Sequence, residues 1–150
     1  MLDNIKELQD KFQVTEFITK NKNNKSALKK YLKFRLDLLK EEVDETLDAY
    51  YNKDGVEVLD GLIDTIVVAL GTLEAFQCNT TKAWKNIHNS NMSKTPGINL
   101  VRSNPFNMPD MVKGKNFKKP ELKNDTGLLK NTLEETTKQL VLVWKYEEIN

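Results

Sequence analysis

Two neighbouring segments combine the apolar periodicity of a helix with acids on one face, and a tight turn separates them. In the first segment, residues 26–52, apolar residues recur every three or four positions, which predicts a long helix with Ser26 as its N-cap. Asn52 to Gly55 has the composition of a turn. The second segment, residues 56–76, is apolar on nearly every side and predicts a buried central helix. The chain is therefore expected to fold around a helical hairpin.

Three further helices are predicted from periodicity, over residues 3–19, 80–92 and 128–148. A strand over residues 139–146 is the alternative within the last of these. Residues 93–125 contain all 4 prolines and show little periodicity, so we expect a loop there that is either disordered or functional. The predicted fold class is an all-α helical bundle of about four to five helices. It should form a single domain over residues 1–150, with a core at about 26–122 and an additional C-terminal helix at about 128–148.

The acids of the predicted hairpin are concentrated on one face of each helix. At about 100° per residue, Glu41, Glu42 and Glu45 fall within a third of the first helix's circumference. By the same arithmetic, the second helix carries Glu57, Asp60 and Asp64 within an arc of about 60°. Apolar residues continue both lines along the helices, so neither is an ordinary solvent face.

Acids within an apolar stripe need a partner. A buried carboxylate costs several kcal/mol, and neighbouring carboxylates repel one another. A divalent cation relieves both problems, and Mg²⁺ prefers oxygen ligands of this kind. Two antiparallel helices joined by a short turn would bring the stripes face to face. The alternative interpretation is that these acids form a solvated face and bind nothing.

Charge and cysteine content exclude several classes of protein. The chain has 23 basic and 22 acidic residues, so bulk charge does not indicate a nucleic-acid partner. Its longest apolar stretch, Ile66 to Leu70, is too short to span a bilayer. A single cysteine, Cys78, is typical of a reducing compartment. We expect a cytoplasmic protein without membrane or nucleic-acid partners.

The acidic segments also resemble a known family. Glu41-Glu42-x-x-Glu45, a spacer and then Glu57-x-x-Asp60 look like the signature of the MazG-like all-α NTP pyrophosphatases. The likeness spans roughly residues 26–122, and its segments follow one order at residues 35–64, 65–76, 89–94 and 112–122. This pattern is similar to the phosphoribosyl-ATP pyrophosphohydrolase-like branch, which includes bacterial and phage proteins.

The resemblance implies a set of site residues. Mg²⁺, or Mn²⁺ in its place, would be held by Glu41, Glu42, Glu45, Glu57 and Asp60. Catalytic roles would fall to Glu41, Glu42 and Glu45, with Glu41 orienting the attacking water. The implied substrate-binding residues are Asp64, Asn91, Lys94, Lys113 and Asn116. Arg35 lies on the first acidic helix, where we expect it to pair with Asp37 or Glu42.

The chain also departs from the family. Of an N-terminal stretch that usually contains Phe-His and Phe-Gly pairs, only Val14 and Phe17 have counterparts here. The loop between Lys94 and Lys113 lacks a Gly-Lys-rich hairpin, and the final helix is an addition. These differences concern base recognition and assembly more than metal binding.

The expected function is therefore Mg²⁺-dependent hydrolysis of a (deoxy)nucleoside triphosphate to its monophosphate and pyrophosphate, in nucleotide-pool house-cleaning. Substrates such as dUTP or dCTP come first, and phosphoribosyl-ATP is the alternative. A non-catalytic nucleotide-binding protein and an unrelated helical interaction protein are the competing functions. The resemblance also implies a homodimer or a dimer of dimers.

Overall fold

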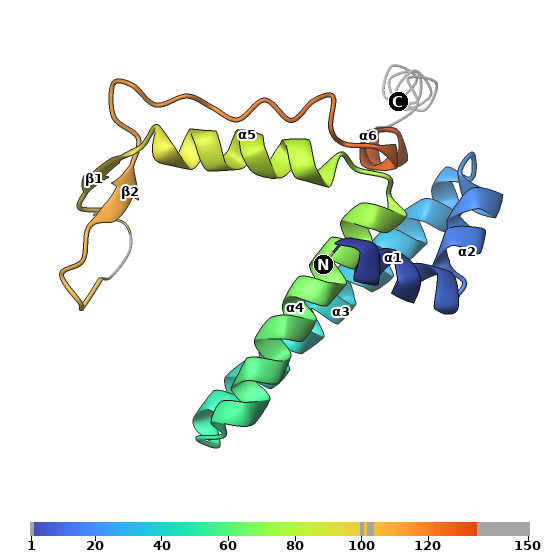
Figure 1. Ribbon diagram of the computed structural model, residues 1–150, viewed down its shortest axis with the longest axis horizontal. Coiled ribbons are helices and arrows are strands. Elements are labelled where there is room, and N and C mark those ends of the chain that lie inside the picture. Colours follow the sequence, from blue (N-terminus) through green and yellow to red (C-terminus); the bar gives the residue numbers. More distant parts are fainter. Residues whose placement is uncertain (1, 100, 102–103, 135–150) are drawn as a thin grey trace, which may run out of the picture. The chain divides into compact units, whose positions relative to one another are not determined.

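The computed structural model describes residues 2–99, 101 and 104–134. Its elements are α1 (Leu2–Lys11), α2 (Val14–Asn21), α3 (Lys25–Tyr51), α4 (Gly55–Ala75), α5 (Thr80–Met92), β1 (Thr95–Gly97), β2 (Asp110–Val112) and α6 (Leu128–Leu133) (Figure 1). The chain divides into two compact units, residues 1–78 with 127–150 and residues 79–126. That residues 1–150 form a single domain stays a prediction.

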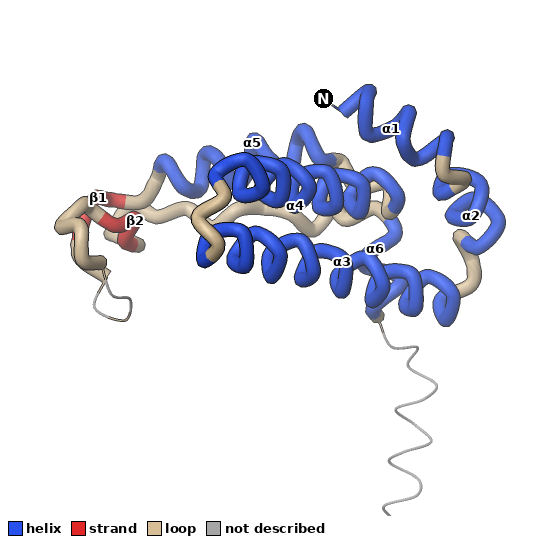
Figure 2. The backbone as a smooth tube through the Cα atoms, turned by 90° about the horizontal axis from the view of Figure 1, so that it is seen from below, coloured by secondary structure: helices blue, strands red, loops and turns tan. Residues whose placement is uncertain are grey.

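The helical hairpin of the first unit is confirmed. Helices α3 and α4 lie side by side and antiparallel (Figure 2). The Asp54 carboxylate caps α4 by accepting hydrogen bonds from the backbone N–H groups of Val56 (3.0 Å) and Glu57 (3.1 Å). At the other end of the hairpin, α3 begins one residue before the expected Ser26 cap. Asn24 takes that role, because its side chain accepts a hydrogen bond from the Ala27 N–H at 3.1 Å.

The predicted first helix, residues 3–19, is wrong as a single element. It is divided at Gln13, whose φ of 60° places it in the left-handed region that no helix interior adopts. The reason lies in the buried residues: Ile5 and Ile18 are 13 positions apart, which is about 220° around one continuous helix. A straight helix could not bury both. The break lets α1 pack on α4 while α2 packs on α3.

The core of this unit lies where α2, α3 and the end of α4 meet. It consists of Ile18, Leu28, Leu32, Ala75 and Phe76. Helix α6 adds to it through Leu128 and Leu129, and the Leu128 N–H donates to the Phe76 carbonyl at 2.7 Å. Gly127 makes this approach feasible, because its φ is 51° and a Cβ there would overlap the Phe76 carbonyl oxygen.

The predicted last helix, residues 128–148, is interrupted near its start. Helix α6 ends at Leu133, and Glu134 has an extended backbone with ψ of 127°. The first residues of α6 are held by the hydrogen bond from the Leu128 N–H to the Phe76 carbonyl. This is a tertiary contact, which helical periodicity in the sequence does not reveal. Residues 135–150, including the alternative strand at 139–146, lie outside the described residues.

The second unit consists of α5 and the loop that follows it. The loop is not wholly irregular, because Thr95–Gly97 pairs antiparallel with Asp110–Val112 in a short hairpin that periodicity had not indicated. The chain then returns along α5 (Figure 1). Asp125 secures this return: its carboxylate is 3.2 Å from Lys82 Nζ and accepts a hydrogen bond from the Asn86 amide at 3.3 Å.

The described elements are mostly helical, with one two-stranded hairpin, so the all-α prediction is confirmed. No helix in the described ranges is both long enough and apolar enough to cross a bilayer.

Candidate functional site

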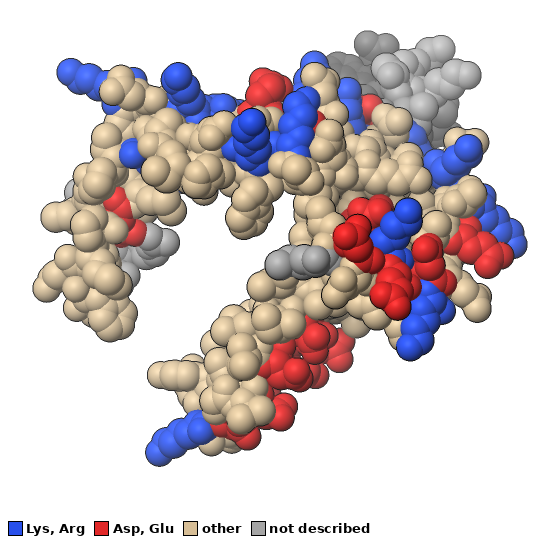
Figure 3. Space-filling view, in the orientation of Figure 1, with Lys and Arg blue, Asp and Glu red and all other residues tan. Residues whose placement is uncertain are grey.

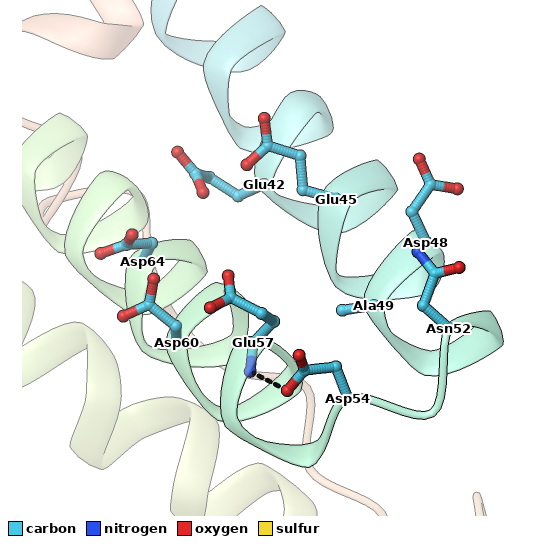
Figure 4. A pocket seen from close by; sticks show the side chains of 10 residues that line it. Glu42, Glu45, Asp48, Ala49, Asn52, Asp54, Glu57, Asp60 and Asp64 are labelled. Carbon is cyan, nitrogen blue, oxygen red and sulfur yellow. Dashed lines mark hydrogen bonds between the residues drawn. The ribbon is translucent and has the colours of Figure 1, made fainter.

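Acidic side chains gather on the α3–α4 hairpin toward its turn (Figure 3). They line a cavity of about 340 Å³ between the two helices, which is within the usual size of a small-ligand site. The lining carboxylates are those of Glu42, Glu45, Asp48, Asp54, Glu57, Asp60 and Asp64. In Figure 4, Glu42 and Glu45 extend from α3 toward the same space as Glu57, Asp60 and Asp64 of α4. The predicted meeting of the two acidic faces is present.

Close packing of the two helices produces this meeting. Gly61, buried on α4, lies against Thr46 of α3, and a Cβ at position 61 would overlap the Thr46 hydroxyl. Ala49, one turn further along α3, is also buried and also lines the cavity. Small residues at the point of contact allow the helix backbones to approach, so that carboxylates on either side of the contact line face one another.

The electrostatics of the cavity fit a cation. Burial raises the pKa of Glu42 above its ordinary value of 4.5, and the charges of Asp64, Glu45, Glu41 and Asp60 raise it further. A raised pKa means that the ionised carboxylate is unfavourable where it stands. The donors are all hard oxygens, which suits Mg²⁺. In the described part of the chain, however, no three potential ligands converge closely enough to hold a metal ion as they stand. The side chains would have to rotate inward on binding.

Of the predicted acidic site residues, one lies outside the cavity. Glu41 is exposed on α3 and does not line the cavity, although its charge contributes to the raised pKa of Glu42. It occupies the angular sector of Glu45 but lies one helical turn farther from the α3–α4 turn.

The cavity also includes residues that sequence reasoning missed. Asp48 and Asn52 follow Glu45 at helical spacing on α3, and Asp54 closes the cavity at the turn. The spacing of Asp48 and Asn52 could have predicted them as cavity residues, because positions three and seven residues after Glu45 return to the same face of the helix. In Figure 4, the Asp48 carboxylate points away from those of the α4 acids.

The expected pairing of Arg35 with an acid is wrong. Its guanidinium donates instead to the Thr72 hydroxyl at 3.2 Å and to the Val68 carbonyl at 3.0 Å, both on α4. Asp37 points to the other side of α3 and binds Lys33. Arg35 is therefore turned inward, where it donates to these two neutral acceptors.

The predicted basic residues belong to the second unit. Lys94 and Asn116 line one cavity there, together with Lys118, which was not predicted. Asn91 does not line it, but its side-chain oxygen accepts a hydrogen bond from Lys94 Nζ at 2.9 Å. Lys113 is not part of this cavity either, and its ammonium lies 5.2 Å from the centre of the Phe117 ring.

The raised pKa of Glu42 predicts how pH and Glu42→Gln change stability. The charge of the Glu42 carboxylate destabilises the fold above the raised pKa, and this penalty shrinks as the pH falls toward 4.5. Well below 4.5 the carboxyl is protonated in both the folded and the unfolded state, and no penalty remains. Without divalent cations at pH 7, we expect Glu42→Gln to raise the melting temperature by a few degrees, and the gain to shrink toward pH 4.5. Circular dichroism melts at both pH values measure it. Asp44→Asn, which removes an acid paired with Lys40, should give no gain, and an equal gain there would contradict the explanation.

A family model described as phosphoribosyl-ATP pyrophosphohydrolase matches residues 6–91, more than half of the 150 residues. The matched range contains every acid of the cavity and ends before Lys94. No curated protein and no solved structure matches the chain.

Proposed function

The chain belongs to the phosphoribosyl-ATP pyrophosphohydrolase family of MazG-like nucleotide pyrophosphohydrolases, and on that premise we propose that it hydrolyses a (deoxy)nucleoside triphosphate with Mg²⁺. The products are the nucleoside monophosphate and pyrophosphate. The observation that carries the proposal is the cavity between α3 and α4, where carboxylates from both helices face each other within the range of the family match.

The acids of the cavity, together with Glu41 next to it on α3, would divide the work. Glu42, Glu45, Glu57 and Asp60, with Glu41 beside them, would hold the cation, which when bound neutralises the charge of the phosphate oxygens. Glu41 would accept a proton from a water as its oxygen attacks the α-phosphorus. The bond from that phosphorus to the bridging oxygen breaks, and pyrophosphate leaves. Asp64, which is partly buried, would contact the sugar or orient another ligand.

The second unit offers hydrogen-bond donors of the kind that bind phosphate oxygens. Lys94 and Asn116 share a cavity, and their ammonium and amide groups are hydrogen-bond donors. We propose both as substrate-binding residues, together with Asn91 and Lys113. Lys118 joins this set because it lines the same cavity.

The direct test is a pyrophosphate-release screen on the full chain. It covers the common NTPs and dNTPs and phosphoribosyl-ATP, each with and without Mg²⁺. Mg²⁺-dependent release from one or more triphosphates, with dUTP and dCTP as leading candidates, supports the proposal. Release from phosphoribosyl-ATP alone would support the second candidate function, which the description of the matched family favours. If no substrate releases pyrophosphate but nucleotides raise the melting temperature, the chain is a nucleotide-binding protein and the proposed activity is wrong.

We also propose that the chain is a homo-oligomer built on the outer face of α4. Val56, Leu59, Leu62, Ile63 and Ile66 are between 46% and 75% exposed. At 100° per residue they lie opposite Gly61 and Asp64, on a face that carries no charged residue between Val56 and Ile66. Monomeric proteins rarely leave a continuous apolar helix face of this length in water. A second copy, which presents the same face, would cover it in an isologous contact.

Substitution of the outer face tests the oligomer. We expect light scattering to give at least about twice the 17.3 kDa chain mass for the wild type. Ile63→Lys should shift the protein toward the monomer, because lysine would bring a charge into the apolar contact. Asn23→Lys places the same charge on an exposed position away from α4 and should leave the mass unchanged. A monomeric wild type would contradict the proposal.

A further inference from the structure

Arg35 makes a contact between α3 and α4 that the proposed chemistry does not use. Its Nε donates to the Thr72 hydroxyl and its Nη2 to the Val68 carbonyl, at 3.2 Å and 3.0 Å. The Thr72 hydroxyl in turn donates to the same Val68 carbonyl at 2.7 Å. A single guanidinium on α3 thus binds two positions of α4 that are one turn apart.

The surroundings are shaped to admit this guanidinium. Gly71 lies beside it, and a Cβ there would be 3.0 Å from Arg35 Nη2 and 3.0 Å from the Gln9 amide nitrogen of α1. Gln9 is only 7% exposed, so α1 covers the contact. An apolar side chain could fill this space between α3 and α4 without the desolvation cost of burying a guanidinium. The arginine therefore has to contribute something other than burial.

The Arg35 contact lies on the same line of contact between α3 and α4, here called the seam, as the acidic cavity. Glu42 follows Arg35 by seven residues, which is two turns and about 10 Å along the same face of α3. On α4, Asp64 precedes Val68 by one turn on the face that meets α3. The two ends of the seam are thus held differently: small residues meet at Gly61, and directional hydrogen bonds act at Val68 and Thr72.

A register error would misplace the acids. Sliding α4 by one residue moves each side chain by about 1.5 Å along the helix and 100° around it. Mg²⁺ holds its ligands at about 2.0–2.1 Å in a near-octahedral arrangement and tolerates little displacement. Leucine and valine surfaces permit such sliding, whereas a planar guanidinium with two fixed acceptors does not.

We propose that Arg35 is a positioning residue, which fixes the register of α3 against α4 through Val68 and Thr72 so that acids of both helices can bind one cation. This inference rests on the proposed metal-dependent function. It assigns no contact with the nucleotide to Arg35.

The test uses two pairs of substitutions in the full chain. Arg35→Gln removes the guanidinium, and Lys33→Gln is its charge-matched control on the solvent side of α3. Thr72→Val removes the hydroxyl at constant shape, and Thr72→Ser keeps it. Mn²⁺ binding without nucleotide is measured from the electron paramagnetic resonance signal of the free ion. The kcat and KM for pyrophosphate release are measured well below each melting temperature.

We expect Arg35→Gln and Thr72→Val each to weaken Mn²⁺ binding by about tenfold, the size of effect seen when groups that orient metal ligands are lost. Both should lower kcat with little change in the KM for the nucleotide. Thr72→Ser and Lys33→Gln should behave as the wild type. If Arg35→Gln does not fold, the Thr72 pair carries the test alone.

Three results would overturn the inference. A lower melting temperature with unchanged Mn²⁺ binding would leave Arg35 a packing residue only. If Arg35→Gln raised the KM while Thr72→Val behaved as the wild type, Arg35 would contact the nucleotide directly. If the wild type binds no Mn²⁺, both the proposed role of Arg35 in setting the register and the proposed metal site are wrong. A wild type that binds Mn²⁺ but hydrolyses nothing would reject only the proposed function, because the Mn²⁺ affinities still decide the role of Arg35.

Discussion

The chain carrying Glu45→Gln is expected to lose pyrophosphate release by at least about a hundredfold, because even groups behind metal ligands cost about ten- to a hundredfold when removed. Glu45 extends from α3 into the cavity that the acids of α4 share (Figure 4). The amide keeps the size of the side chain and removes its negative charge. The remaining acids would then bind the cation more weakly, and the charge on the phosphate oxygens would be less well neutralised.

Asp44→Asn is the matched control for this prediction. Asp44 is the neighbouring acid, but it points to solvent and pairs with Lys40. Its substitution changes the net charge by the same amount and should leave kcat within about twofold, because surface pairs of this kind contribute little. The measurement is the rate of Mg²⁺-dependent pyrophosphate release at saturating nucleotide. If Glu45→Gln kept half of the wild-type rate, the cavity would not be the active site.

The second large effect is expected from Gly61→Ala. The new Cβ would overlap the Thr46 hydroxyl and lie 3.3 Å from the Thr46 Cβ, so α3 and α4 must separate. Overpacking of this kind costs about 1–3 kcal/mol, of which the better helix propensity of alanine returns about 1 kcal/mol. Because the separation widens the cavity, we expect activity to fall by more than about tenfold, a larger loss than the small change in stability suggests.

Two further variants separate this explanation from a general effect of alanine. Gly55→Ala makes the same substitution at the start of the same helix, where nothing lies within 4 Å, and should lose neither stability nor activity. Thr46→Ala removes the overlapping hydroxyl, so the double variant Gly61→Ala with Thr46→Ala should recover most of the activity. Urea unfolding and pyrophosphate release measure the two effects. Failure of the double variant to recover would mean that Gly61 acts in another way.

The sequence located the acidic faces and their hairpin correctly because both are local properties. Helical periodicity places Glu42 and Glu45 on one face of α3, and Asp60 and Asp64 on one face of α4, whatever the rest of the chain does. A turn of three residues then leaves the helices little choice but to pack antiparallel. For the same reason, Asp48 and Asn52 could have been included, since they continue the same face.

The errors concern features that depend on distant contacts. The break at Gln13 follows from the separate partners of α1 and α2, which no periodicity within residues 3–19 contains. The orientation of Arg35 depends on Val68 and Thr72, more than 30 positions away, and the nearby Asp37 was a misleading guide. The pairing of β1 with β2 joins residues 17 positions apart at Thr95 and Val112, across a loop with no strand pattern.

By itself, then, the sequence determined which faces of which helices are acidic or apolar, because side-chain direction repeats with the geometry of the helix. Only the tertiary structure decided how far apart those faces lie and in what register, since this depends on Gly61 meeting Thr46 and Arg35 reaching α4. A cation site needs both. Its ligand types are fixed along the chain, whereas the distances between them arise from packing between helices.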